Sequence, residues 1–273
     1  MDLVYVYDGS FDGLLTAIFE AYANKEQPAR IVEPQDLQYG LEQREREICT
    51  DEGKARRVEQ GIISKIGHPA YRTVWTTFLS GKPEKAMVLY RYVCACFTQG
   101  RRIYNNLAHP DVLAMQALQG PIMREVQKLL GFARFAHMEN GVYYAKIAPQ
   151  NSVVPLLMPH FADRFNIQPF LLHDCVHQLA GVYTGTEWYL AETAGVELPA
   201  YAEDEIGFKR MWKRFYDSLV IVERINPKVQ RNNMPKRYWP NMVEHTFAEA
   251  YHAQGNSEQK NLNLQVAKKI LQK

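Results

Sequence analysis

The segment from Phe208 to Pro240 carries the residues best suited to chemistry, because cations and aromatic rings alternate along it. It holds nine lysines and arginines against two acidic residues, a net charge of +7 in a chain whose total is +2. Trp212, Tyr216, Tyr238 and Trp239 lie between these charges. Cations beside aromatic faces are what a phosphate backbone with unstacked bases requires. The segment therefore indicates a nucleic-acid surface.

A second interpretation of the same segment is an ordinary amphipathic helix. Apolar residues recur there at steps of three and four, which places them on one helix face: Phe208, Met211, Trp212, Phe215, Leu219 and Val222. The opposite side would be solvated by Lys209, Arg210, Lys213, Arg214 and Asp217 while the aromatic rings enter the core. The stretch from Asn226 to Trp239 favours the nucleic-acid interpretation, because we expect it to be irregular and it is rich in amides and cations that helix solvation does not explain.

The nucleic-acid interpretation assigns roles to particular side chains of this segment. Tyr238 or Trp239 would stack on a base. The residues predicted to contact phosphates are Arg210, Lys213, Arg214, Lys228, Arg231, Lys236 and Arg237.

A turn rich in acid and glycine, Asp8-Gly9-Ser10-Phe11-Asp12-Gly13, falls between a predicted strand and a predicted helix. Free N–H groups at a helix start favour an anion, but the two aspartates would repel a phosphate unless a divalent cation bridged them. Three interpretations stay open: a helix cap with glycines serving the turn, a metal-bridged nucleotide site, and a catalytic base at Asp8 or Asp12. Asp8, Ser10 and Asp12 are thus the candidate catalytic residues.

Histidines near residue 175 suggest a metal site, for which His173, Asp174 and His177 are the candidate ligands and His160 lies upstream. In one continuous strand, His173 and His177 would be about 13 Å apart and could not share an ion, whereas a turn over 174–177 would let them converge. We expect a structural His–Asp pair and no metal. We also expect no cofactor. The four cysteines lack the spacing of zinc ligands or of iron-sulfur cluster ligands, which argues against both groups.

The sequence predicts an α+β fold for the helices and strands that position these residues. Leu3–Tyr7, a helix from Leu14 and Ala29–Val32 form a predicted parallel strand-helix-strand unit. From residue 41 to 130 the pattern is helical, with no convincing strand. One of its helices starts at Thr50-Asp51-Glu52 and carries an apolar stripe made of Ala55, Val58, Ile62, Ile63 and Ile66.

The pattern changes to an antiparallel sheet with packed helices after residue 130. Asn140-Gly141 predicts a hairpin between Phe132–Met138 and Val142–Ile147. Val153–Phe165 predicts a helix, and 170–183 with 187–190 predict two or three further strands. The expected organisation is 1–130, 131–247 and a polar tail over 248–273, or one domain for all of it.

Composition narrows the class of protein. The chain of 273 residues is 47% hydrophobic and 23% charged, which is ordinary for a globular protein and excludes a disordered one. Its longest apolar stretch, Ala86–Phe97, is interrupted by Arg91 and falls short of the roughly 20 residues that a membrane span needs. Met1–Tyr5 lacks the basic and apolar regions of a secretory signal, so we expect a cytoplasmic protein with no membrane partner.

Six motifs in this order resemble a bacterial family of unknown function whose members are usually labelled DNA metabolism or DNA repair proteins. The resemblance covers about residues 3 to 245. The motifs are Tyr7–Ala17, Thr50-Asp51 with Lys54–Val58, Gly131–Phe135, His160–Phe165, His173-Asp174, and Asn226–Lys228 through Pro235–Trp239.

The resemblance implies a setting and a partner, not a reaction. Members of that family are typically encoded beside a radical-SAM protein, and some carry a fused uracil-DNA-glycosylase-like domain. We therefore predict a DNA-binding accessory to a radical-SAM or glycosylase-like repair enzyme. Two alternatives stay open: an enzyme that acts on a nucleotide or damaged base at the Asp8–Gly13 turn, and a docking module whose basic surface meets an acidic partner protein.

Overall fold

The computed structural model describes residues 2–38, 40, 42–104, 106–193 and 200–246. The chain divides into two compact units, the first over Met1–Arg124 and the second from Glu125 onward. Both units mix helices and strands, so the predicted α+β class is confirmed. The predicted polar tail over 248–273 lies outside the described residues.

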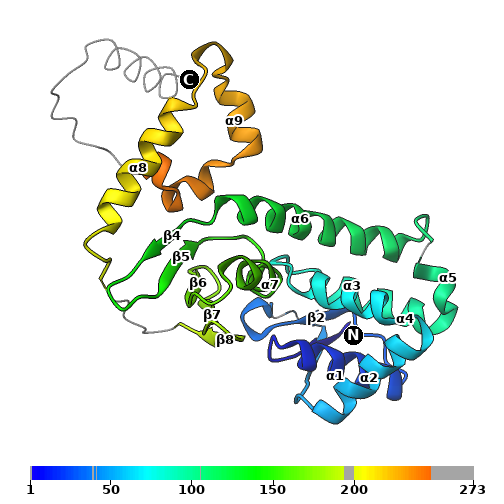
Figure 1. Cartoon of the computed structure of the whole chain (residues 1–273). Helices are drawn as coiled ribbons and strands as arrows, with labels where there is room; N and C mark the ends of the chain where they lie inside the picture. The colour runs from blue at the N-terminus through cyan, green and yellow to red at the C-terminus, as the bar shows by residue number, and fades with distance from the viewer. Residues whose placement is uncertain (1, 39, 41, 105, 194–199, 247–273) are drawn as a thin grey trace, which may run out of the picture. The chain divides into compact units, whose positions relative to one another are not determined.

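The first unit is built on a three-stranded parallel sheet, drawn in blue in Figure 1. Its central strand is β1 (Asp2–Val6), which α1 (Phe11–Ala23) connects to β2 (Arg30–Val32). The expected parallel strand-helix-strand unit is therefore confirmed. The third strand, β3 (Gln43–Glu47), pairs with the other edge of β1, and a short 3-10 helix, η1 (Pro34–Asp36), lies between β2 and β3 in sequence.

Strand β3 corrects the expectation that residues 41 to 130 hold no strand. Its sequence, Gln-Arg-Glu-Arg-Glu, has no apolar alternation, so hydrophobic periodicity gave no indication of it. It is an edge strand that forms by pairing with the buried β1, and edge strands tolerate charge. Arg46 in β3 forms ion pairs with Glu20 at 3.0 Å and Glu26 at 2.7 Å.

Helices supply the rest of the first unit. α2 (Glu52–Lys65) begins after Asp51, whose carboxylate accepts a hydrogen bond from the Lys54 N–H at 3.0 Å, so the predicted helix start is confirmed. Ala55, Val58, Ile62 and Ile66 of the predicted stripe are buried in the core. The following helices are α3 (His68–Phe78), α4 (Lys85–Gln99), α5 (Arg101–Tyr104) and α6 (Pro110–Phe132), whose residues from Glu125 onward belong to the second unit.

The second unit contains a five-stranded sheet in the order β4-β5-β6-β7-β8. Its strands are β4 (Phe135–His137), β5 (Tyr143–Ile147), β6 (Phe170–Asp174), β7 (Leu179–Tyr183) and β8 (Trp188–Glu192). The hairpin β4–β5 is confirmed, with Gly141 at φ 80° in its turn. β5 and β6 pair in parallel, because α7 (Val154–Phe165) crosses from one to the other, so the sheet is mostly rather than wholly antiparallel.

The segment that follows the sheet forms short helices. These are α8 (Glu205–Ser218), η2 (Val222–Arg224), α9 (Pro227–Asn233), η3 (Lys236–Asn241) and α10 (Val243–Thr246). The expectation that 226–239 is irregular is therefore wrong. Asn226 caps α9 by accepting from the N–H groups of Lys228 and Val229, both at 3.2 Å, and Pro227 occupies the first helical position. Within the described residues, no helix is long and apolar enough to cross a membrane.

Close packing of α7 on the sheet gives a test of the second unit. A Cβ added at Gly181 in β7 would lie 2.1 Å from the sulfur of Met158, a fully buried side chain of α7. We expect Gly181→Ala to lower the free energy of unfolding by about 1 to 3 kcal/mol, because the core must be overpacked. Urea unfolding followed by circular dichroism measures the change.

Gly207→Ala is the matched control for that substitution. Gly207 lies in α8, and nothing would touch an added Cβ there. We expect it to stabilise the chain by about 1 kcal/mol through helix propensity. Equal effects of both substitutions would contradict the packing described for Gly181.

Candidate nucleic-acid interface

Helix α8 is held to the sheet by polar contacts. Glu205, in its first turn, is the one residue of the helix that is buried. A carboxylate oxygen of Glu205 accepts a hydrogen bond from the backbone N–H of His137 in β4 at 2.8 Å. The other oxygen lies 3.8 Å from the Lys209 ammonium. A carboxylate therefore occupies the place that an apolar residue takes in most amphipathic helices.

A second buried carboxylate, that of Glu244 in α10, fixes the middle of α8. Arg134 donates two hydrogen bonds to Glu244, at 2.6 and 3.2 Å, and the Trp212 indole N–H donates a third at 3.1 Å. The Arg134 guanidinium also lies 5.1 Å from the centre of the Trp212 ring. Burial alone would raise the pKa of Glu244, but the hydrogen bonds from Arg134 and Trp212 lower it below its ordinary value.

These anchors hold α8 in place without burying its apolar face. Phe208, Met211 and Phe215 are 53%, 58% and 54% exposed. The alternative interpretation, in which the aromatic rings of this helix enter the core, is therefore wrong. The helix also ends at Ser218, so Leu219 and Val222 lie beyond it.

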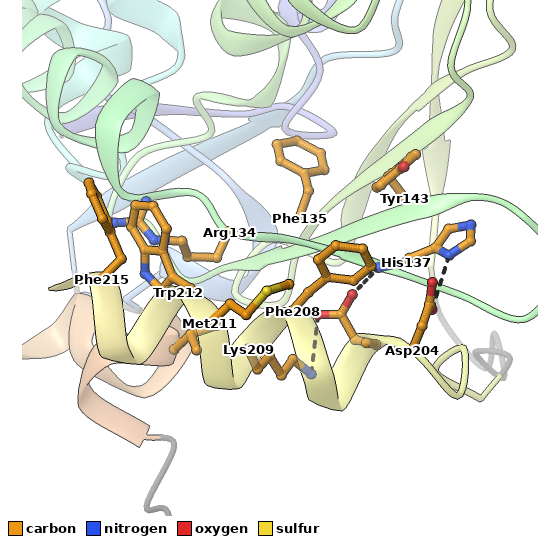
Figure 2. A pocket seen from close by; sticks show the side chains of 12 residues that line it. Arg134, Phe135, His137, Tyr143, Asp204, Phe208, Lys209, Met211, Trp212 and Phe215 are labelled. Atoms are coloured by element: carbon orange, nitrogen blue, oxygen red, sulfur yellow. Dashed lines mark hydrogen bonds and ion pairs between the residues drawn. The ribbon is translucent and has the colours of Figure 1, made fainter. Parts of the chain in front are cut away.

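The exposed face of α8 forms one wall of a groove of about 650 Å³, which we call the aromatic groove. Phe135 in β4 and Tyr143 in β5 line the groove from the other side. Figure 2 shows Phe208, Trp212 and Phe215 rising from α8 on the side of the helix that faces β4. The complete lining is Arg134, Phe135, His137, Tyr143, Asp204, Glu205, Phe208, Lys209, Met211, Trp212, Phe215 and Val243.

None of the nine cations between Phe208 and Pro240 is buried. Lys209, Lys213 and Arg231 are half-buried. Lys213 is neutralised by Asp217, one turn further along α8, at 2.6 Å. Six cations are exposed: Arg210, Arg214, Arg224, Lys228, Lys236 and Arg237. The predicted phosphate contacts therefore lie on α8, α9 and η3, at positions open to solvent or partly so.

The predicted stacking residues differ in exposure. Tyr238 is 2% exposed and its hydroxyl donates to Glu125 at 2.9 Å, so it does not present its ring, and Trp239 stays as the other predicted stacking residue. Burial raises the pKa of Tyr238 to about 12. Trp239 is half-buried and stacks on His245, with ring centres 4.5 Å apart.

A third buried carboxylate, that of Glu125 in α6, explains why Tyr238 points inward. It accepts from the backbone N–H groups of Gln150 and Asn151 at 3.0 Å each and from the Asn151 side chain at 2.6 Å. The Arg237 guanidinium lies 3.4 Å from the same carboxylate. η3 is therefore tied to α6 through Tyr238 and Arg237.

The Asp8–Gly13 turn adopts the helix-cap arrangement. Asp8 accepts from the Ser10 N–H at 2.9 Å, from the Ser10 hydroxyl at 2.7 Å and from the Thr50 hydroxyl at 2.7 Å. Burial alone would raise the pKa of Asp8, but these hydrogen bonds lower it. The Ser10 oxygen also accepts from the Gly13 N–H at 2.9 Å and caps α1. The structure thus brings Asp8 and Ser10 together in a structural role, while Asp12 is exposed in the first turn of α1.

The candidate metal ligands point to different partners. A turn does fall after Asp174, whose carboxylate accepts from the N–H groups of Val176 and His177 and lies 2.6 Å from His177 Nδ1. His173 instead contacts the hydroxyls of Tyr144 and Thr193 at 2.9 and 3.0 Å, and burial lowers its pKa. His160 is exposed on α7. Within the described ranges, no three histidine, cysteine or acidic side chains form a group that could hold a metal ion.

Sequence reasoning missed the acidic residues that build this site. No sequence pattern singled out Glu125, Glu205 or Glu244, because each acts on residues distant in the chain. Glu244 lies 110 positions from Arg134. The Gly131–Phe135 motif contained both Arg134 and Phe135, but nothing in it indicated a groove.

The Glu244 anchor gives a test that depends on pH. We expect Glu244→Gln to lower the free energy of unfolding at pH 7 by about 3 kcal/mol, because it leaves Arg134 without its buried partner. A lowered carboxyl pKa stabilises the fold above the ordinary value of 4.5, and this stabilisation is lost as the pH falls through the lowered value. The difference from the natural chain should therefore shrink below pH 4.5, as urea unfolding at several pH values would show.

Glu223→Gln is the control for that experiment. Glu223 is exposed in η2, in the same part of the chain. Its replacement should change stability by less than about 0.5 kcal/mol. If the Glu244→Gln variant is as stable as the Glu223→Gln variant at pH 7, the ion pair between Glu244 and Arg134 does not anchor the fold.

Residues 83–244 match the family model described as a domain of unknown function, DUF4130. The match covers more than half of the chain and contains the whole basic and aromatic segment together with the aromatic groove. No curated protein matches the chain significantly.

Proposed function

The chain belongs to the DUF4130 family, whose function is unknown, and from that premise we propose that it binds nucleic acid through the segment from Phe208 to Pro240. The proposed role is that of a DNA-binding accessory in DNA metabolism or repair. The resemblance carried by the six sequence motifs supplies this setting. A radical-SAM protein or a uracil-DNA-glycosylase-like protein is the proposed partner enzyme.

One observation carries the proposal: a segment with a net charge of +7 leaves all nine of its cations at least partly open to solvent. Buried carboxylates engage Arg134, Lys209 and Arg237, and Asp217 pairs with Lys213. The segment still has an excess of positive charge at its surface, and a phosphate backbone is the common polymer that such an excess attracts.

An accessory role agrees better with the geometry than an enzyme at the Asp8–Gly13 turn. The Ser10 hydroxyl donates to Asp8 and accepts from Gly13, so both of its hydrogen-bonding functions serve the cap of α1. The same turn lies outside residues 83–244, which the family model matches. A cytoplasmic location is part of the proposal, since a chain that acts on chromosomal DNA must share its compartment.

Charge reversal at two exposed lysines tests the proposal. We expect the double variant Lys228→Glu, Lys236→Glu to bind DNA roughly tenfold more weakly or worse. The slope of log affinity against log salt should also fall by about 0.7 to 0.9 for each phosphate that the variant no longer neutralises. Fluorescence anisotropy with labelled single-stranded, duplex and uracil-containing DNA, at about 50 and about 200 mM salt, measures both quantities.

Arg72→Glu, Lys82→Glu is the matched control, because it changes the net charge equally at exposed positions of the first unit. It should retain nearly all of the affinity and the slope. If both double variants bind as the natural chain does, or if the natural chain binds no DNA even at low salt, the proposed function is wrong. The basic segment would then be a surface for a partner protein.

A further inference from the structure

The proposed function does not use the aromatic groove, and we propose that this groove takes one unstacked nucleotide of a single-stranded nucleic acid. The base would lie in the groove, and its phosphate would lie in a smaller hollow beside it. This inference rests on the proposed function and names the form of nucleic acid that the site selects. The observation that supports this inference is an exposed aromatic groove that lies beside a hollow lined by cations.

The aromatic groove suits a flat, uncharged group. Phe208, Trp212 and Phe215 of α8 face the groove with Phe135 and Tyr143 of the sheet. Base stacking on aromatic rings contributes to the binding of single strands without regard to sequence. The volume of about 650 Å³ falls in the range of sites for small organic ligands.

The arginine and the lysine that line the groove are each compensated by a carboxylate. Arg134 lies 2.6 Å from Glu244, and Lys209 lies 3.8 Å from Glu205. A phosphate would gain little there, because its attraction to each cation is offset by the neighbouring carboxylate. A neutral base meets no such opposition, so we assign the base to the groove.

The smaller hollow, of about 260 Å³, suits the phosphate. It shares Arg134, Phe135, Glu205, Lys209 and Val243 with the aromatic groove, so the two are adjacent. Lys146 of β5 lines only the smaller hollow and is exposed. Within the described residues Lys146 forms no ion pair, which leaves its charge available to an anion. The hollow thus adds to Arg134 and Lys209, which already pair with Glu244 and Glu205, a third cation, Lys146, whose charge the phosphate would meet.

The arrangement selects a single strand over a duplex. Bases inside a duplex are stacked on both faces, so aromatic side chains in a groove reach them only when they leave the stack. Arg210 and Arg214 of α8 are exposed and lie outside the lining of the groove, where the neighbouring phosphates of a strand would meet them. A partner protein would also find apolar contacts in the groove, but it would not require a cationic hollow beside them.

Three probes with equal numbers of phosphates test the inference: oligothymidylate of about twelve residues, an abasic strand of the same length, and a duplex. We expect the natural chain to bind oligothymidylate more tightly than the abasic strand. The double variant Phe208→Ala, Phe215→Ala should weaken oligothymidylate binding from about fivefold to about a hundredfold and bind the abasic strand as before. Its salt slope should stay unchanged, because the same phosphates are neutralised.

A lysine variant tests the contribution of the phosphate to binding separately from that of the base. Lys146→Ala should lower the salt slope by about 0.7 while keeping the preference for oligothymidylate over the abasic strand. Titration with thymidine monophosphate distinguishes a free nucleotide from a strand as the source of the ligand. Competition by the monophosphate that is lost in Phe208→Ala, Phe215→Ala supports the site, and competition that survives this variant contradicts it.

Ile206→Ala is the matched control, since Ile206 is an exposed apolar residue of α8 outside the lining of the groove. Circular dichroism and urea unfolding establish that the groove variants fold, as their exposed positions predict. If folded groove variants bind oligothymidylate like the Ile206→Ala control, the inference is wrong and the groove is left to a partner protein. That result would not contradict the proposed function. The proposed function is wrong only if salt-dependent DNA binding is absent, or if charge reversal in the basic segment leaves that binding unchanged.

Discussion

The ion pair between Glu244 and Arg134 is the interaction on which the rest of the site depends. Withdrawing a carboxylate from water is unfavourable unless strong donors replace the water, and here Arg134 and Trp212 supply them. Trp212 lies in α8, so satisfying Glu244 also fixes how far that helix is rotated. Because Trp212 belongs to the apolar stripe, this contact turns the stripe toward β4, where it lines the aromatic groove and stays exposed.

Buried carboxylates divide the cations of the second unit into two groups. Arg134, Lys209 and Arg237 face Glu244, Glu205 and Glu125. These cations hold the structure together. Other cations, such as Lys228 of α9 and Lys236 of η3, are exposed on the outer surface, which is the electrostatic basis for assigning them to a phosphate backbone.

The two units use their polar side chains differently. The first unit contains a small parallel sheet. After its central strand, Asp8, Ser10 and Thr50 are hydrogen-bonded to one another, and Ser10 caps α1. The second leaves aromatic and basic side chains open around two adjacent hollows. The residues that match the family, 83–244, contain all of this open surface except Thr246 and exclude the Asp8–Gly13 turn. The polar groups of the first unit thus serve the fold, while those of the second leave a surface open to a ligand.

Local patterns in the sequence were enough to determine the elements that form by short-range rules. The Asn140-Gly141 hairpin, the Asp51 cap of α2 and the α7 helix each depend on residues within a few positions, so spacing alone predicted them. The same holds for the excess of positive charge between Phe208 and Pro240, which is a property of composition.

The tertiary structure alone decided which side of α8 faces the protein and where the aromatic groove lies. An amphipathic pattern places apolar residues on one face but does not state what that face meets. Here the face borders a groove, and Glu244, 32 positions along the chain, holds Trp212. β3 likewise forms only because a buried strand pairs with it. In both cases the deciding contact joins residues distant in sequence, which a local pattern does not record.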